Sequence, residues 1–109
     1  MAERRELSSA LEKHYRACGW PVERAADGTV RAVGPGGVTW IGLPVVADDL
    51  EHEELAERLL ALSEQRMPTG QLCPLELLPA ADCAGELRRL LEELRLAGRG
   101  HVEIYSRAA

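Results

Sequence analysis

Apolar residues recur at helical spacing at the start of the chain and predict an N-terminal helix over residues 2–18. One face of that helix carries an apolar stripe at Leu7, Ala10, Leu11, His14 and Cys18. Gly19 follows at the position of a C-terminal helix cap. We therefore expect the helix to end at Gly19, with the ring of Trp20 packed on Tyr15.

Three short segments rich in strand-forming residues come next, with turns between them, at 21–25, 29–33 and 38–43. A three-residue first turn, with Gly28 in the left-handed region, places Glu23 opposite Arg31. A two-residue turn would instead oppose Arg24 and Arg31, and directly opposed like charges are unfavourable. The third segment is apolar on both faces, so we expect an antiparallel meander with this strand at the centre of the sheet.

The second half of the chain alternates helical and strand patterns. Helices are expected at 49–66 and 82–97, and strands at 72–78 and 101–106. Asp48 and Glu51 have the spacing of a capping box for the first of these helices, and Asp82 is expected to cap the second.

The complete order, α-β-β-β-α-β-α-β, predicts an α+β fold. The last two strands are joined through a helix and should therefore be parallel. We expect a two-layer sandwich in which a mixed five-stranded sheet carries its helices mainly on one face. At 109 residues, the chain has the length of a single globular domain, 1–109.

Charge is unevenly distributed along the chain. The formal net charge is −5, and the residues after position 47 carry all of the acidic excess, because the residues before it have one more basic than acidic group. Nucleic-acid binding requires clustered Lys and Arg, and no basic stripe is present, so we expect no nucleic-acid partner. An acidic surface favours a basic protein partner.

Composition also bears on origin and location. Arginine far outnumbers lysine, and asparagine and phenylalanine are absent, a bias that indicates a bacterial gene of high G+C content. No apolar run approaches the length of a membrane span, and the first residues do not resemble a secretory signal. We therefore expect a cytoplasmic protein with no membrane contact and with reduced cysteines.

Six carboxylates lie within residues 48–57, which we call the acidic segment. Acidic side chains at a helix N-terminus interact favourably with the helix dipole, so a merely solvated helix face would explain the pattern. The alternative is a docking surface for a basic partner, formed chiefly by Asp49, Glu53, Glu54 and Glu57. The acids lack the alternating spacing of a calcium loop.

Trp40 is the second candidate for partner binding. It shares one side of the central strand with Val38, and helices on the other face would leave this side open. An exposed apolar patch on a sheet is typical of an interface, either with a partner or in a homodimer. A covering helix is the competing interpretation.

The opening element order, over residues 5–66, is similar to that of double-stranded-RNA-binding domains. Those domains carry lysines at the start of the second helix, where this chain carries the acidic segment. The charge has the wrong sign for RNA. Secretion chaperones have a similar opening and are small and acidic, so a chaperone-like role agrees better with the charge.

The remaining chemical candidates are weaker. Cys83 lies near the start of a predicted helix, where the helix dipole lowers a thiol pKa, but adjacent Asp82 acts in the opposite direction. His14 and Cys18 lie four residues apart on one helix face, and Cys73 and Cys83 could complete a set of four zinc ligands. The set comes from separate elements and lacks a zinc-site spacing, so we expect no metal and no cofactor. Glu76 and Glu103 are expected on the solvated face of the sheet.

These patterns favour a small acidic cytoplasmic protein-interaction module, an adaptor, chaperone-like or regulatory protein, over an enzyme. Two alternatives remain open. One is an antitoxin or immunity protein that masks the basic site of a toxin. The other is a small thiol-dependent enzyme that uses Cys83.

Overall fold

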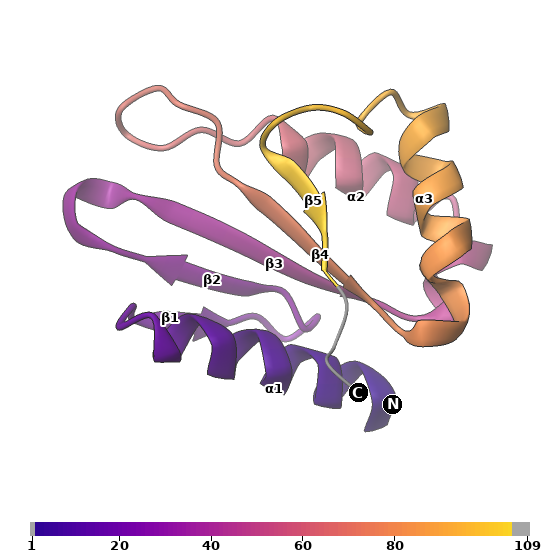
Figure 1. Ribbon diagram of the computed structural model, residues 1–109, viewed down its shortest axis with the longest axis horizontal. Coiled ribbons are helices and arrows are strands. Elements are labelled where there is room, and N and C mark those ends of the chain that lie inside the picture. The colour runs from indigo at the N-terminus through magenta and orange to yellow at the C-terminus, as the bar shows by residue number, and fades with distance from the viewer. Residues whose placement is uncertain (1, 106–109) are drawn as a thin grey trace.

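The computed structural model describes residues 2–105 and contains three α-helices around one sheet (Figure 1). The helices are α1 (Ala2–Ala17), α2 (Glu54–Ser63) and α3 (Ala84–Glu93), and the strands are β1 (Val22–Arg24), β2 (Val30–Val33), β3 (Thr39–Val45), β4 (Leu75–Pro79) and β5 (Val102–Ile104). Short 3₁₀ helices η1 (Pro35–Gly37), η2 (Ala47–Glu51) and η3 (Ala81–Cys83) join some of them. The predicted α+β class and element order are confirmed.

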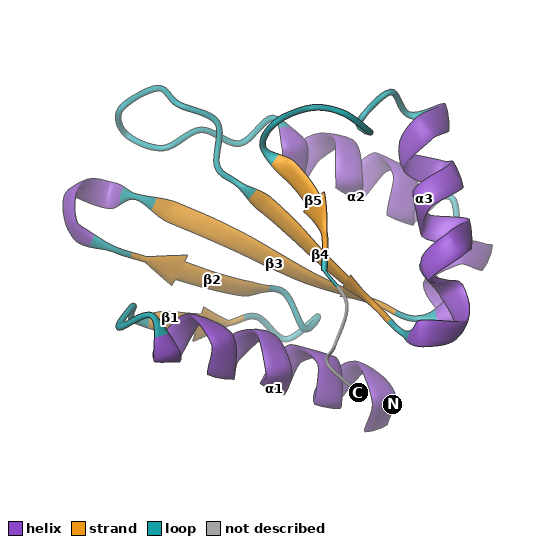
Figure 2. Ribbon diagram, in the orientation of Figure 1, coloured by secondary structure: helices purple, strands orange, loops and turns teal. Residues whose placement is uncertain are grey.

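The five strands form one mixed sheet in the order β1-β2-β3-β4-β5 (Figure 2). The first three strands are antiparallel, and β3, β4 and β5 are parallel to one another. Glu23 pairs with Arg31, and Gly28 has a φ of 95°. The predicted meander, its register and the central position of the third strand are therefore confirmed.

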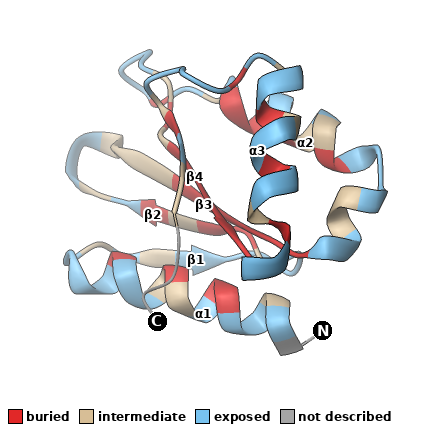
Figure 3. Ribbon diagram, turned by 45° about the vertical axis from the view of Figure 1, so that its right-hand side comes forward, coloured by how far each residue is buried: buried red, intermediate tan, exposed pale blue. Residues whose placement is uncertain are grey.

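Side chains alternate along β3 and define the two faces of the sheet. Gly42 faces α1, because a Cβ atom there would lie 2.9 Å from the hydroxyl of Tyr15. Its neighbours Ile41 and Leu43 point the other way and are buried. Most of the helical structure, α2 and α3, lies on that second face, and α1 covers the first face over the meander (Figures 1 and 3).

Buried apolar side chains from every layer join in one core cluster. Its most enclosed members include Leu11 from α1, Ile41 from β3, Leu59 from α2 and Leu87 from α3. The predicted stripe of α1 is wrong at its end, because His14 and Cys18 are exposed and Tyr15 is buried instead. A straight helix drifts relative to a fixed stripe, and the face that meets the sheet continues from Leu11 to Tyr15.

Two helices end in Schellman motifs. At the end of α1 the N–H of Gly19 donates to the carbonyl of Arg16, and that of Trp20 donates to Tyr15, as predicted for a glycine cap. The third helix is shorter than predicted, because Arg95 adopts a φ of 59° and ends it before Leu96. Leu96 is buried, so the apolar residue after the cap is fixed to the core.

The predicted N-terminal caps are wrong. Residues 47–51 form η2, and α2 begins only at Glu54. The N-cap of η2 is Val46 and not Asp48, and the carboxylate of Asp49, three residues later, accepts from the N–H of Val46. Asp82 lies within η3 and makes no capping hydrogen bond to α3.

Candidate functional site

The acidic segment leaves the end of β3, runs through η2 and enters the first turn of α2. Five of its six carboxylates are exposed, namely Asp48, Glu51, Glu53, Glu54 and Glu57. The fold brings them together because the short η2 helix turns the chain directly from the central strand into α2. They make the stretch of chain that follows β3 accessible and anionic.

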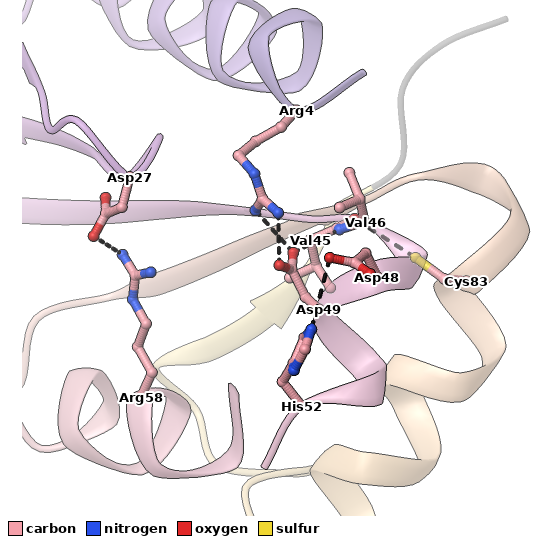
Figure 4. A network of polar contacts seen from close by, with 9 residues as sticks. All are labelled: Arg4, Asp27, Val45, Val46, Asp48, Asp49, His52, Arg58 and Cys83. Carbon is pink, nitrogen blue, oxygen red and sulfur yellow. Dashed lines mark hydrogen bonds and ion pairs between the residues drawn. The ribbon is translucent and has the colours of Figure 1, made fainter. Parts of the chain in front are cut away.

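Asp49 differs from its neighbours because it is part of the scaffold. Its carboxylate accepts two hydrogen bonds from Arg4 of α1, at 2.6 and 2.8 Å, and a third from the N–H of Val46 at 2.9 Å (Figure 4). A bidentate pair of this kind fixes both side chains. Asp49 therefore connects α1 to the end of β3 and is not free for a partner.

The pKa of Asp49 shows which of these effects dominates. Burial alone would raise it, but the hydrogen bond from Arg4 and the Val46 N–H together outweigh burial and hold the pKa below its usual value. The hydrogen bond with Asp49 raises the pKa of Arg4 in turn. Both groups are charged at neutral pH, so the pair is a permanent ionic contact.

A second ion pair fixes the hairpin to α2. Arg58 donates to Asp27 at 2.5 Å (Figure 4). It also donates to the hydroxyl of Thr29. The pKa of Asp27 is lowered, because hydrogen bonds from Thr29 and the charge of Arg58 outweigh its partial burial. Arg4–Asp49 joins α1 to η2, and Arg58–Asp27 joins α2 to the hairpin, so the two pairs hold four parts of the fold beside one small hollow.

That hollow has a volume of about 170 Å³ and lies beside the acidic segment. It is lined by Arg4, Asp49, His52, Glu54, Leu55 and Arg58. His52 lies 3.7 Å from Asp48 and is well exposed. The hollow is polar and open, with both charge signs on its wall, so it suits a charged side chain of a partner better than an apolar ligand.

Trp40 lies at the other end of β3 from the acidic segment. Five residues separate it from Val45, which corresponds to roughly 17 Å along a strand. It is half-buried, and its ring meets Trp20 edge-on at 4.4 Å between centroids. The partner of Trp20 is thus Trp40 and not Tyr15, and the two candidate surfaces are separate.

Cys83 is among the most enclosed residues of the protein, with 1% of its surface exposed. Its thiol donates to the carbonyl oxygen of Val45 (Figure 4) and is shared with that of Ala80. Burial raises the pKa of the thiol, and the charge of nearby Asp82 raises it further. A buried thiol of raised pKa is a poor nucleophile. No histidine lies within hydrogen-bond reach of it among residues 2–105, so the thiol-enzyme alternative gains no support.

The three cysteines are unpaired, with Cys18 exposed and Cys73 buried like Cys83. Over the described part of the chain, no three His, Cys, Asp or Glu residues lie together as metal ligands. None of its helices is long and apolar enough to cross a membrane.

Glu76 was predicted to lie on the solvated face of the sheet, and this prediction is wrong. It is buried on the α1 face of β4, and accepts hydrogen bonds from Tyr15 at 2.5 Å and from Tyr105. Burial, and then these hydrogen bonds, raise the pKa of both phenols. The expected solvated position was wrong for Glu76 but right for Glu103, which is exposed.

No local signal identified this cluster, because its members come from α1, β4 and the residue after β5. Only the parallel register, which pairs Glu76 with Glu103, places Tyr105 on the same face. Two phenol groups donate hydrogen bonds to the buried carboxylate of Glu76, and the cluster joins three parts of the fold. We therefore interpret it as a structural contact.

Comparison of this chain with protein-family models, with curated proteins and with solved structures found no match.

Proposed function

We propose that this protein is a small cytoplasmic interaction module that binds a basic protein partner through the acidic segment. The observation that carries the proposal is the exposure of five carboxylates within ten residues, from η2 to the first turn of α2, at Asp48, Glu51, Glu53, Glu54 and Glu57. A face of one charge attracts a partner of the opposite charge and speeds the encounter. An adaptor, a chaperone-like protein or a regulatory protein must recognise a protein partner, and an exposed acidic surface can do so.

Two features of the scaffold support the proposal. Asp49 and Arg58 are engaged in internal ion pairs, which hold η2 and α2 in place without using the exposed carboxylates. The hollow beside them offers room for a basic side chain next to Glu54.

Three unpaired cysteines agree with a reducing compartment.

The role of Trp40 in this proposal is secondary. Its ring packs on Trp20 and lies far from the acidic segment, so one small partner segment does not reach both. A second contact or a homodimer interface near Trp40 remains a separate prediction.

Charge reversal tests the proposal directly. The variant Glu53→Lys, Glu54→Lys, Glu57→Lys changes three exposed residues and leaves Asp49 intact. Proteins captured from lysate of the source organism are identified by mass spectrometry, for native protein and variant at two salt concentrations. We expect the variant to lose specific basic partners that the native protein retains, and high salt to weaken the same partners.

The matched control reverses three exposed glutamates of α3, Glu86→Lys, Glu92→Lys, Glu93→Lys. This control changes the net charge by the same amount as the first variant. It therefore measures the effect of net charge on capture when the acidic segment is left intact. Circular dichroism confirms that both variants fold. If both variants lose the same proteins, or neither does, the acidic segment is not the docking face.

A further inference from the structure

A second hollow lies between the start of α1 and the β1–β2 hairpin. Its volume is about 250 Å³, and its wall is formed by Arg4, Arg5, Ser8, Arg24, Ala25, Ala26 and Gly28. Three of these residues are arginines, and none is acidic. In a protein of net charge −5 this is a local concentration of positive charge.

The backbone on one side of this hollow is held firmly. The hydroxyl of Ser8 donates to the carbonyl of Gly28 at 2.8 Å. Gly28 also has a φ of 95°, and a Cβ atom there would lie 3.0 Å from that hydroxyl. The hairpin turn can approach α1 this closely only because residue 28 is glycine.

Two of the arginines are positioned by groups beside the hollow. Arg24 donates to the carbonyl of Arg5 at 3.1 Å and to the hydroxyl of Ser9 at 2.8 Å. Arg4 is held by the carboxylate of Asp49. A guanidinium has more N–H donors than these contacts use, so each keeps donors for a ligand while its orientation is fixed.

Arg5 completes the set. It is exposed, and within residues 2–105 its side chain has no hydrogen bond or ion pair. The one carboxylate of the hairpin turn, Asp27, is engaged by Arg58 and by the N–H of Thr29, and it does not line the hollow. Arg24 also lies 3.6 Å from Glu12 in an ion pair, and Arg4 is paired with Asp49. No acid lines the hollow itself, and among residues 2–105 Arg5 is the arginine of its wall whose charge has no acidic partner.

We propose that this hollow binds the phosphate group of a small molecule, either inorganic phosphate or a phosphate monoester. Fixed guanidinium groups match the oxygens of a phosphate in a bidentate manner, and the nearly double negative charge suits several arginines. The volume admits a phosphate with a small organic group. A nucleic-acid strand does not fit this interpretation, because the exposed carboxylates of the acidic segment repel a continuous phosphate backbone.

Titration of ¹⁵N-labelled protein followed by NMR tests this site. Inorganic phosphate and glycerol 3-phosphate are added separately, with acetate as a singly charged comparison. We expect saturable shifts at the amides of Ala26 and Gly28, with tighter binding of either phosphate than of acetate. Equal affinities for the two compounds would show that the phosphate group alone is recognised. Tighter binding of glycerol 3-phosphate would show that the site prefers a phosphate monoester, and both results support the proposal.

Variants locate the binding. Arg5→Gln and Arg24→Gln should each weaken phosphate binding by about tenfold, because each removes a charged donor, whereas Arg88→Gln on α3 should leave it unchanged. The side chain of Arg5 has no partner within residues 2–105, so Arg5→Gln should leave the fold intact. It therefore tests the site even if Arg24→Gln unfolds the hairpin. Shifts that never saturate, equal binding of acetate, or native affinity in Arg5→Gln would overturn the proposal.

Discussion

Asp49 shows how one residue can be mistaken for part of a binding surface. In sequence it is one of six acids in a row of ten residues, and nothing distinguishes it. In the structure it bonds Arg4 and the N–H of Val46, and Val46 is buried. A variant of Asp49 would therefore disturb the fold and give no clean information about a partner.

Asp49→Ala should lower the free energy of unfolding by about 1–2 kcal/mol, because it removes a cap and leaves the Val46 N–H unpaired. Urea denaturation at pH 7 measures the change. A control, Asp48→Ala, removes an exposed neighbouring carboxylate and should change stability little. Equal effects of the two substitutions would contradict the structural role of Asp49.

The lowered pKa of Asp49 also predicts a pH dependence. A carboxylate with a folded pKa below its unfolded value stabilises the protein above the unfolded pKa, and this contribution is lost as pH falls through the folded pKa. The usual value is 3.8, so the loss should occur below about pH 4. Asp49→Asn should make the urea midpoint less sensitive to pH in that range. An unchanged slope would show that the pair does not titrate as described.

The phenols of Tyr15 and Tyr105, which contact Glu76, predict a loss of stability at alkaline pH. Burial and the hydrogen bonds to Glu76 raise the pKa of Tyr15 and Tyr105 above the usual value of 10.0. The unfolded chain then loses phenol protons first, so stability should fall as pH rises above about 10. Absorbance at 295 nm should show no tyrosinate in folded protein at pH 10.5, and tyrosinate in urea. Ionisation of both phenols at the same pH in both states would refute the buried cluster.

At the scale of the elements, the local patterns predicted the strands and their register better than the helix ends. The glycine cap at Gly19 was found because glycine has a specific backbone preference. Arg95 ends α3 in the same conformation with no such signal, so the helix was predicted too long. The buried Leu96 shows that packing, and not local preference, ends this helix.

Arg95→Gly should raise the free energy of unfolding by about 0.5–1 kcal/mol, because glycine adopts a positive φ without steric cost. Thermal denaturation followed by circular dichroism measures it. Arg99→Gly is the control at an exposed position without a positive φ. Destabilisation by Arg95→Gly of the same size as by Arg99→Gly would mean that Arg95 is not strained.

Over the whole molecule, the sequence predicted the fold but misplaced several individual side chains. Alternation and turn chemistry suffice to locate five strands and to pair the first three as a meander, because those signals are local. The contacts of Asp49 with Arg4, and of Glu76 with Tyr15, join residues far apart in the chain and depend on how α1 crosses the sheet. The acidic segment was found because its members adjoin in sequence, whereas the arginines around the second hollow come from two elements.

Side chains from α1, the sheet, α2 and α3 share one core cluster. We therefore expect the chain to unfold in one cooperative step. Tryptophan fluorescence reports on Trp20 and Trp40 beside the meander, and circular dichroism reports mainly on the helices. Coincident urea transitions by the two signals are expected, and two separated transitions would show that α2 and α3 unfold independently of the meander.

The proposed function requires direct contact between the acidic segment and a basic protein. Zero-length crosslinking of carboxylates to lysines, in lysate, tests it by contact alone and without any substitution. The account predicts crosslinks from Glu53, Glu54 or Glu57 to lysines of the partners lost on charge reversal. Crosslinks that involve only carboxylates of α3, or none from the acidic segment to those proteins, would contradict it.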